Sequence, residues 1–149
     1  IEAPWAPASV ATVGGVIGAG VLAVHPADRC GVAELARVAH WMAGESAGQC
    51  GPCRFGLPAI AADLDALVMP HQSAGARDAV RARLNLVTGR GGCRLPDGLT
   101  RFVATGLDVF AADVDAHEAG QCLAGGATMA LPTPAARPTP VDRPGRALR

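Results

Sequence analysis

The apolar residues of this chain recur at three- and four-residue spacing over most of residues 31–117, and this period is the strongest constraint on its fold. The first run, with Val32, Leu35 and Met42 among its members, predicts a helix over residues 31–45. A second run follows Pro52, which fits a first helical turn, and stops at Pro70.

Two further helices are expected in the second half of the chain. Ser73 is a suitable cap for a helix over residues 76–87, and Asp97 for one over residues 98–117. Helices joined by short connections pack as bundles. The sequence therefore predicts a mainly α fold built as a small four-helix bundle.

The segment 5–24 carries no charge, so it must be weighed as a membrane span. Pro7, its several glycines and the absence of flanking basic residues oppose a membrane helix, because glycine costs about 1 kcal/mol relative to alanine within a helix. We favour a glycine-rich turn followed by a short buried strand over residues 20–25.

Past the helices the sequence becomes rich in proline and predicts a disordered Pro/Arg-rich tail over residues 124–149. We accordingly expect three parts: a strand and turn segment over 1–27, the helical bundle over 28–123, and this tail. Because the chain begins at Ile1 rather than methionine, we also expect it to be a piece of a longer protein.

Composition excludes several classes of function. The 13 basic residues, all arginine, balance 13 acidic ones, which gives no argument for a nucleic-acid partner. Five cysteines form an odd number and include a tight pair, which favours a metal or redox role in a reducing compartment over a disulfide framework. We find no glycine-rich phosphate loop and no supported catalytic triad, so we expect no enzyme active site within these 149 residues.

The stretch ESAGQCGPCRFG contains a Cys-x-x-Cys pair, Cys50 and Cys53, at the start of the second helix. Both sulfurs can face one side there, towards the positive end of the helix, which favours an anionic cluster. Gly48 and Gly51 would let the backbone approach such a cofactor, and Arg54 would add a positive charge nearby.

A third thiol, Cys93, lies just before the predicted fourth helix, and in a bundle it can meet the first two. Zinc is an alternative to an iron-sulfur cluster and would need a fourth ligand such as His117, although a histidine so placed is more typical of a solvated side chain. Thiol-disulfide exchange is a third alternative, but the strand-helix setting of thioredoxin-like motifs is missing.

These residues resemble a known family. The stretch ESAGQCGPCRFG is similar to the cluster-binding loop Glu-Ser-Cys-Gly-x-Cys-x-Pro-Cys-Arg-x-Gly of the NADH-binding flavoprotein subunit of respiratory complex I and of related diaphorase subunits. Cys93 falls at the distance of that family's fourth cysteine. The resemblance covers roughly residues 14–122, and it makes the first segment the end of a ubiquitin-like domain.

The resemblance implies an iron-sulfur electron-transfer module with Cys50, Cys53 and Cys93 as metal ligands. It places FMN and NADH on a missing upstream domain, and it implies other redox subunits or an electron carrier as partners. It further implies a cytoplasmic protein that meets a membrane only through its complex, at the inner face. The chain alone would not be catalytic, and its parent would be an NADH:quinone oxidoreductase or diaphorase.

One position departs from the family pattern. Ala47 stands where the family has its first cysteine, and a methyl group cannot bind iron. The remaining options are a 4Fe-4S cluster with a non-standard fourth ligand, a 3Fe-4S cluster, or a degenerate structural or interaction domain that has lost its cluster. Cys30 and Cys122 are candidates for the missing ligand, but neither sits where the family has one.

Overall fold

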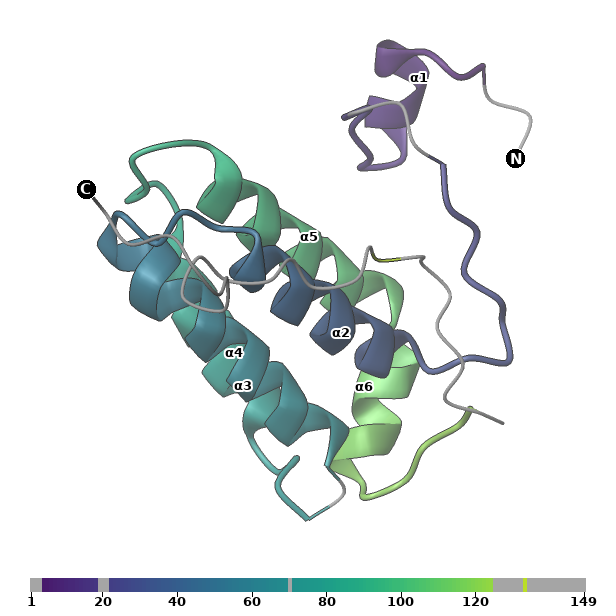
Figure 1. Ribbon diagram of the computed structural model, residues 1–149. Helices are drawn as coiled ribbons and strands as arrows, with labels where there is room; N and C mark the ends of the chain where they lie inside the picture. The colour runs from purple at the N-terminus through teal and green to yellow at the C-terminus, as the bar shows by residue number, and fades with distance from the viewer. Residues whose placement is uncertain (1–3, 19–21, 70, 125–132, 134–149) are drawn as a thin grey trace, which may run out of the picture.

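The computed structural model describes residues 4–18, 22–69, 71–124 and 133, and these residues form a mainly helical domain (Figure 1). The helices, in chain order, are α1 Pro7–Thr12, α2 Gly31–Gly44, the π-helical turn η1 Pro52–Gly56, α3 Leu57–Val68, α4 Ala76–Val87, α5 Leu95–Val109 and α6 Ala111–Glu118.

Four helices form the bundle that the sequence predicts. α3 packs against α2 and α4, and α5 packs against the same two helices, so the four close around one core. α6 crosses one end and contacts all four. The six largest fully buried side chains are leucines and one isoleucine: Leu35, Leu57, Ile60, Leu64, Leu67 and Leu99. Each such side chain stabilises the fold by about 1.5–3 kcal/mol through burial.

The region before the bundle differs from expectation. Residues 22–25, the described part of the predicted strand, lie outside any strand or helix. The uncharged segment instead contains the short helix α1, which buries none of its residues. No helix within the described parts of the chain is long and apolar enough to cross a membrane. Apart from residues 124 and 133, the predicted tail lies outside the described residues.

Two predicted helix caps are wrong. Gly75, with φ of +73°, precedes α4 in place of Ser73, whose carbonyl accepts a hydrogen bond from the Ala76 N–H at 3.0 Å. α5 begins at Leu95, so Asp97 lies within its first turn. The Asp97 carboxylate accepts a hydrogen bond from the Gly89 N–H at 2.8 Å and thereby braces the loop before α5.

The predicted fourth helix is two helices. The helix breaks at Phe110, whose φ of −99° and ψ of 30° are not helical. The Phe110 ring covers Gly31, where an added Cβ would lie 2.3 Å from the ring. The break turns α6 across the start of α2, and there the Asp113 carboxylate accepts a hydrogen bond from the Gly31 N–H at 3.0 Å. Periodicity alone missed this break because the apolar spacing continues through it.

Close packing of α2 against α5 predicts that replacing two glycines of α5 by alanine will have opposite effects on stability. A Cβ at Gly106 would lie 2.3 Å from the buried Leu35 side chain, whereas one at Gly98 would meet nothing within 4 Å. Gly106→Ala should therefore destabilise the domain by about 1–3 kcal/mol. Gly98→Ala should stabilise it by about 0.5–1 kcal/mol. Urea unfolding measures both, and equal effects would contradict the packing described here.

Candidate metal centre

The turn that carries the cysteine pair follows the end of α2 and begins on Cys50. Gly48 has a φ of +65°, a conformation that favours glycine, and turns the chain towards η1. The Cys50 carbonyl then accepts a hydrogen bond from the Arg54 N–H at 2.9 Å, so Cys50 stands at the start of the turn. Cys53 lies within η1 and is buried. Short π-helical turns of this kind often mark functional sites.

The thiols of Cys50 and Cys53 lie in different electrostatic environments. Hydrogen bonds from the backbone N–H groups of Gly92 and Cys53 lower the pKa of the half-buried Cys50 thiol. Burial raises the pKa of the Cys53 thiol, and the neighbouring Cys50 and Cys93 thiols add to the rise. The pair thus joins one thiol that ionises readily with one that resists ionisation.

The structure brings the three predicted ligands to one end of the bundle. Cys93 is exposed and lies in the loop before α5, beside Gly92, whose N–H reaches Cys50. The charge of Cys93 also acts on Cys53. Figure 1 shows this loop and η1 at the same end of the bundle. We call Cys50, Cys53 and Cys93 the cysteine triad.

The other predicted site residues are neighbours of Cys50 and Cys53 along the chain. An added Cβ would meet nothing within 4 Å at Gly48 or at Gly51, so both leave open space beside the thiols. Arg54 and Ala47 are exposed.

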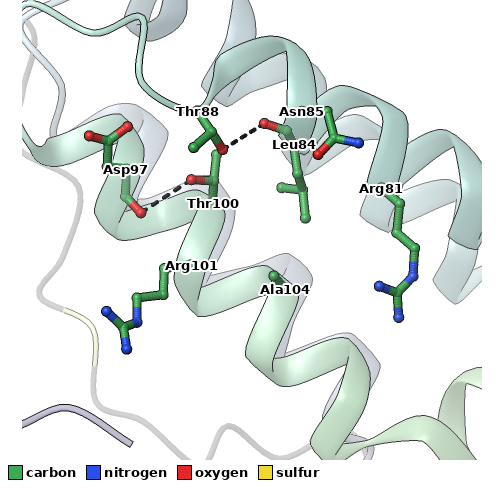
Figure 2. Close-up of a pocket in the computed structure, with 8 residues that line it drawn as sticks. All are labelled: Arg81, Leu84, Asn85, Thr88, Asp97, Thr100, Arg101 and Ala104. Carbon is green, nitrogen blue, oxygen red and sulfur yellow. Dashed lines mark hydrogen bonds between the residues drawn. The ribbon is translucent and has the colours of Figure 1, made fainter. Parts of the chain in front are cut away.

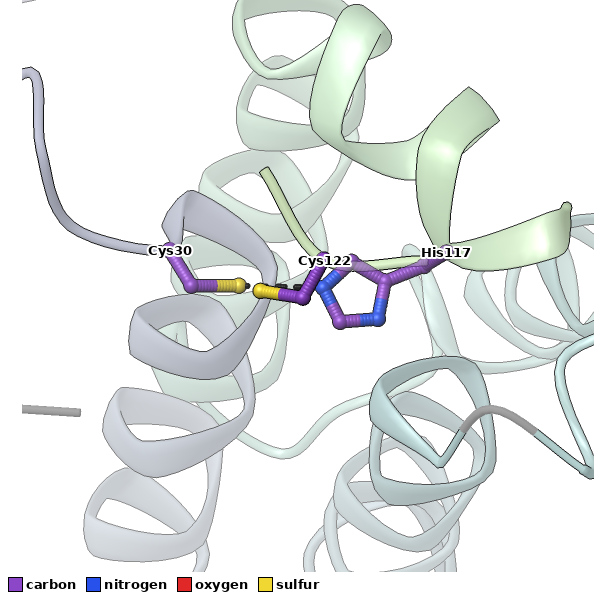
Figure 3. A group of neighbouring side chains, drawn as sticks. All are labelled: Cys30, His117 and Cys122. Carbon is purple, nitrogen blue, oxygen red and sulfur yellow. Dashed lines mark hydrogen bonds between the residues drawn. The ribbon is translucent and has the colours of Figure 1, made fainter. Parts of the chain in front are cut away.

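Sequence reasoning missed a second group of ligand atoms. The thiols of Cys30 and Cys122 and the imidazole of His117 lie within 4.8 Å of one another (Figure 3). His117 is 3% exposed, so the expectation of a solvated side chain is wrong. The only signals in the sequence were a lone cysteine and the short stretch HEAGQC, which is too short to identify a metal motif.

This second group cannot complete the triad. Cys30 caps the start of α2, whereas the triad lies beyond its end. A helix of 14 residues is roughly 20 Å long. Cys30, His117 and Cys122 are therefore excluded as a fourth ligand, and zinc binding by the triad with His117 is excluded with them.

A groove lies between α4 and α5 (Figure 2). Its volume is about 440 Å³. Its hydroxyls are used within their own helices, since Thr88 donates to the Leu84 carbonyl and Thr100 to the Asp97 carbonyl. The Arg81 guanidinium pairs with Asp108 at 2.9 Å.

Comparison with known proteins identifies the family. Residues 33–117 match the model of the NADH-ubiquinone oxidoreductase-F iron-sulfur binding region. The match covers more than half of the chain and includes the whole cysteine triad. The chain belongs to this family, whose members bind an iron-sulfur cluster. Neither a search of curated proteins nor a search of solved structures finds a match.

The contrast between the paired thiols predicts different rates of alkylation in the metal-free, reduced protein. Because the thiolate is the nucleophile, Cys50 should react with iodoacetamide faster than Cys53, and its reaction should begin at lower pH. Peptide mass spectrometry after brief labelling across a pH series measures both. Cys53 labelling as early as Cys50 would contradict the described hydrogen bonding.

Proposed function

We propose that this domain is an electron-transfer module that holds an iron-sulfur cluster through Cys50, Cys53 and Cys93. The observation that carries the proposal is the presence of these three thiols at one end of the bundle, inside the region that matches the iron-sulfur family. Cluster ligands bind different iron atoms, so they need not approach one another as closely as the ligands of a single ion.

The residues present fit a cluster held by three thiolates. Cys50 already receives N–H groups of the kind that stabilise sulfur bound to iron, and Gly48 and Gly51 leave space for a bulky group. Four protein thiolates do not fit, because position 47 is alanine. The proposal is therefore a 4Fe-4S cluster with a non-standard fourth ligand, or a 3Fe-4S cluster.

Each part of the site has a distinct task in this proposal. Each of the three thiols gives up its proton on metal binding. The N–H groups of Gly92 and Cys53 stabilise the negative charge on Cys50, and the exposed Arg54 adds positive charge nearby. A bound cluster would supply one-electron transfer. The half-buried and exposed thiols place the site at the surface, where an electron partner can approach.

The proposed donor is a flavin, FMN reduced by NADH, on a domain upstream of this chain. Membership of the family supports other redox subunits of an NADH dehydrogenase-like complex as partners. In that setting the chain is not catalytic by itself. It works in the cytoplasm and reaches the inner face of a membrane only through the complex.

Ala47 favours a second candidate function, a structural or interaction domain that descends from the same module and has lost the cluster. Cys50→Ser separates the two functions. A bound cofactor stabilises only the state that binds it, so the variant should lose stability together with iron if a cluster is present. A stability unchanged from that of the parent would favour the second candidate.

Anaerobic reconstitution with iron and sulfide tests the leading proposal. We expect bound iron together with a three-iron paramagnetic signal when oxidised or a four-iron signal when reduced. Cys50→Ser, Cys53→Ser and Cys93→Ser should each lower the iron content. Cys122→Ser is the matched control and should retain the cluster, because its thiol lies with Cys30 and His117 and not with the triad. Colourless, iron-free protein would refute the proposal.

Restoring the missing cysteine gives a further prediction. Ala47 is exposed, so Ala47→Cys should be accommodated without a change in packing. Where the parent holds a 3Fe-4S cluster, the fourth thiolate should raise the iron content to that of a 4Fe-4S cluster and replace the three-iron signal with a four-iron one. Iron analysis and paramagnetic resonance of parent and variant measure this gain. A three-iron signal that persists in the variant would show that position 47 does not face the cluster.

A further inference from the structure

The second group of ligand atoms, those of Cys30, His117 and Cys122, is drawn from three separate segments of the chain. Cys30 caps α2, His117 belongs to the last turn of α6, and Cys122 follows that helix. The Cys30 Sγ lies 3.1 Å from the His117 Nε2 (Figure 3). Cys30 and Cys122 lie outside the segment that matches the iron-sulfur family, so the family model does not account for this group.

The turn after α6 is built so that Cys122 returns towards Cys30. Gly120 has a φ of +76°, and its N–H donates to the His117 carbonyl at 2.9 Å. The next N–H, that of Gln121, donates to the Ala116 carbonyl at 2.8 Å. These two bonds form a Schellman motif, a helix ending that reverses the chain. The position of Cys122 therefore follows from regular backbone geometry.

The His117 ring is oriented as a metal ligand requires. Its Nδ1 lies 3.1 Å from the Val68 carbonyl, which can only accept a hydrogen bond, so Nδ1 carries the proton. The Nε2 lone pair is then directed at the two sulfurs. Metal-binding histidines commonly donate their second ring nitrogen to a backbone carbonyl in this way. In the absence of metal, Nε2 accepts a hydrogen bond from the Cys30 S–H.

The donor set and its charge select the metal. Two thiolates carry two negative charges and therefore neutralise one divalent ion. Neutrality matters at this site because Cys30 and His117 are buried, and a net charge is costly away from water. Two sulfurs and one imidazole nitrogen are typical zinc ligands, and zinc sites with three protein ligands take water as the fourth. Cys122 is exposed, so one side of the group is open to such a ligand.

We propose that Cys30, His117 and Cys122 bind a single zinc ion. On binding, both thiols release their protons, while His117 keeps its Nδ1 proton on the Val68 carbonyl. The ion joins the start of α2 to the segment after α6 and thereby fixes the end of the bundle opposite the cysteine triad. The proposal does not depend on iron binding by the triad.

The test uses the full chain with Cys50→Ser and Cys53→Ser, so that the triad cannot take up zinc. Equilibrium dialysis of the reduced protein against Zn²⁺, followed by metal analysis, should find about one zinc per chain. Cys122→Ser should lower zinc affinity roughly tenfold or more. Because Cys122 is exposed, this variant should still fold, which circular dichroism verifies. His71→Gln is the control, since His71 is an exposed histidine outside the group, and it should bind zinc as before.

Cobalt substitution gives an independent readout. Co²⁺ in the same background should show thiolate-to-metal charge transfer, and this absorption should weaken in Cys122→Ser and be lost in Cys30→Ser with Cys122→Ser. Absence of bound zinc would overturn the proposal, as would zinc binding that both thiol substitutions leave unchanged. A Cys30–Cys122 disulfide in place of metal binding under reducing conditions would also overturn it.

Discussion

The structure depends on one apolar core that closes between four helices. Because α2, α3, α4 and α5 fill the interior with leucine, isoleucine and valine, polar and metal-binding side chains are excluded from the middle of the bundle. The buried thiols and imidazole, those of Cys30, Cys53 and His117, lie instead at the two ends, where helices begin and stop and where backbone N–H and carbonyl groups are free to bind side chains. The core therefore separates the thiols of this chain into two groups.

The two ends use helix termini differently. At the triad end, backbone N–H groups from the start of η1 and from the loop before α5 converge on Cys50 and favour its thiolate. At the other end, Cys30 caps α2 by accepting the Ala33 N–H at 3.3 Å, while His117 satisfies the last carbonyl of α3. Burial raises the pKa of the Cys30 thiol, and the Ala33 N–H partly offsets that rise. Cys50, at the triad end, thus ionises readily and is available as a nucleophile or ligand, whereas Cys30, at the other end, is buried.

α6 links these local features to the fold as a whole. Its position across the bundle follows from the break at Phe110 and from the Asp113 carboxylate on the Gly31 N–H. Arg77 on α4 adds ion pairs with Asp115 and with Glu118 of α6, the latter at 2.8 Å. These contacts hold the start of α2 and the end of α6 together. They explain why residues 87 positions apart, Cys30 and His117, lie within hydrogen-bonding distance.

The sequence by itself determined most helices of the bundle and pointed to the three cysteines of the triad. Helical period and proline placement are local, so the bounds of α2 and α4 could be predicted closely, and the loop around Cys50 and Cys53 carries its family pattern within twelve residues. The resemblance also placed Cys93. Only the tertiary structure decided where α5 ends, which residues cap α4 and α5, and that Cys30, His117 and Cys122 meet. Those outcomes depend on packing between distant segments. The pattern of apolar residues along the chain predicts where a helix forms, but it does not specify the direction that the chain takes where the helix ends.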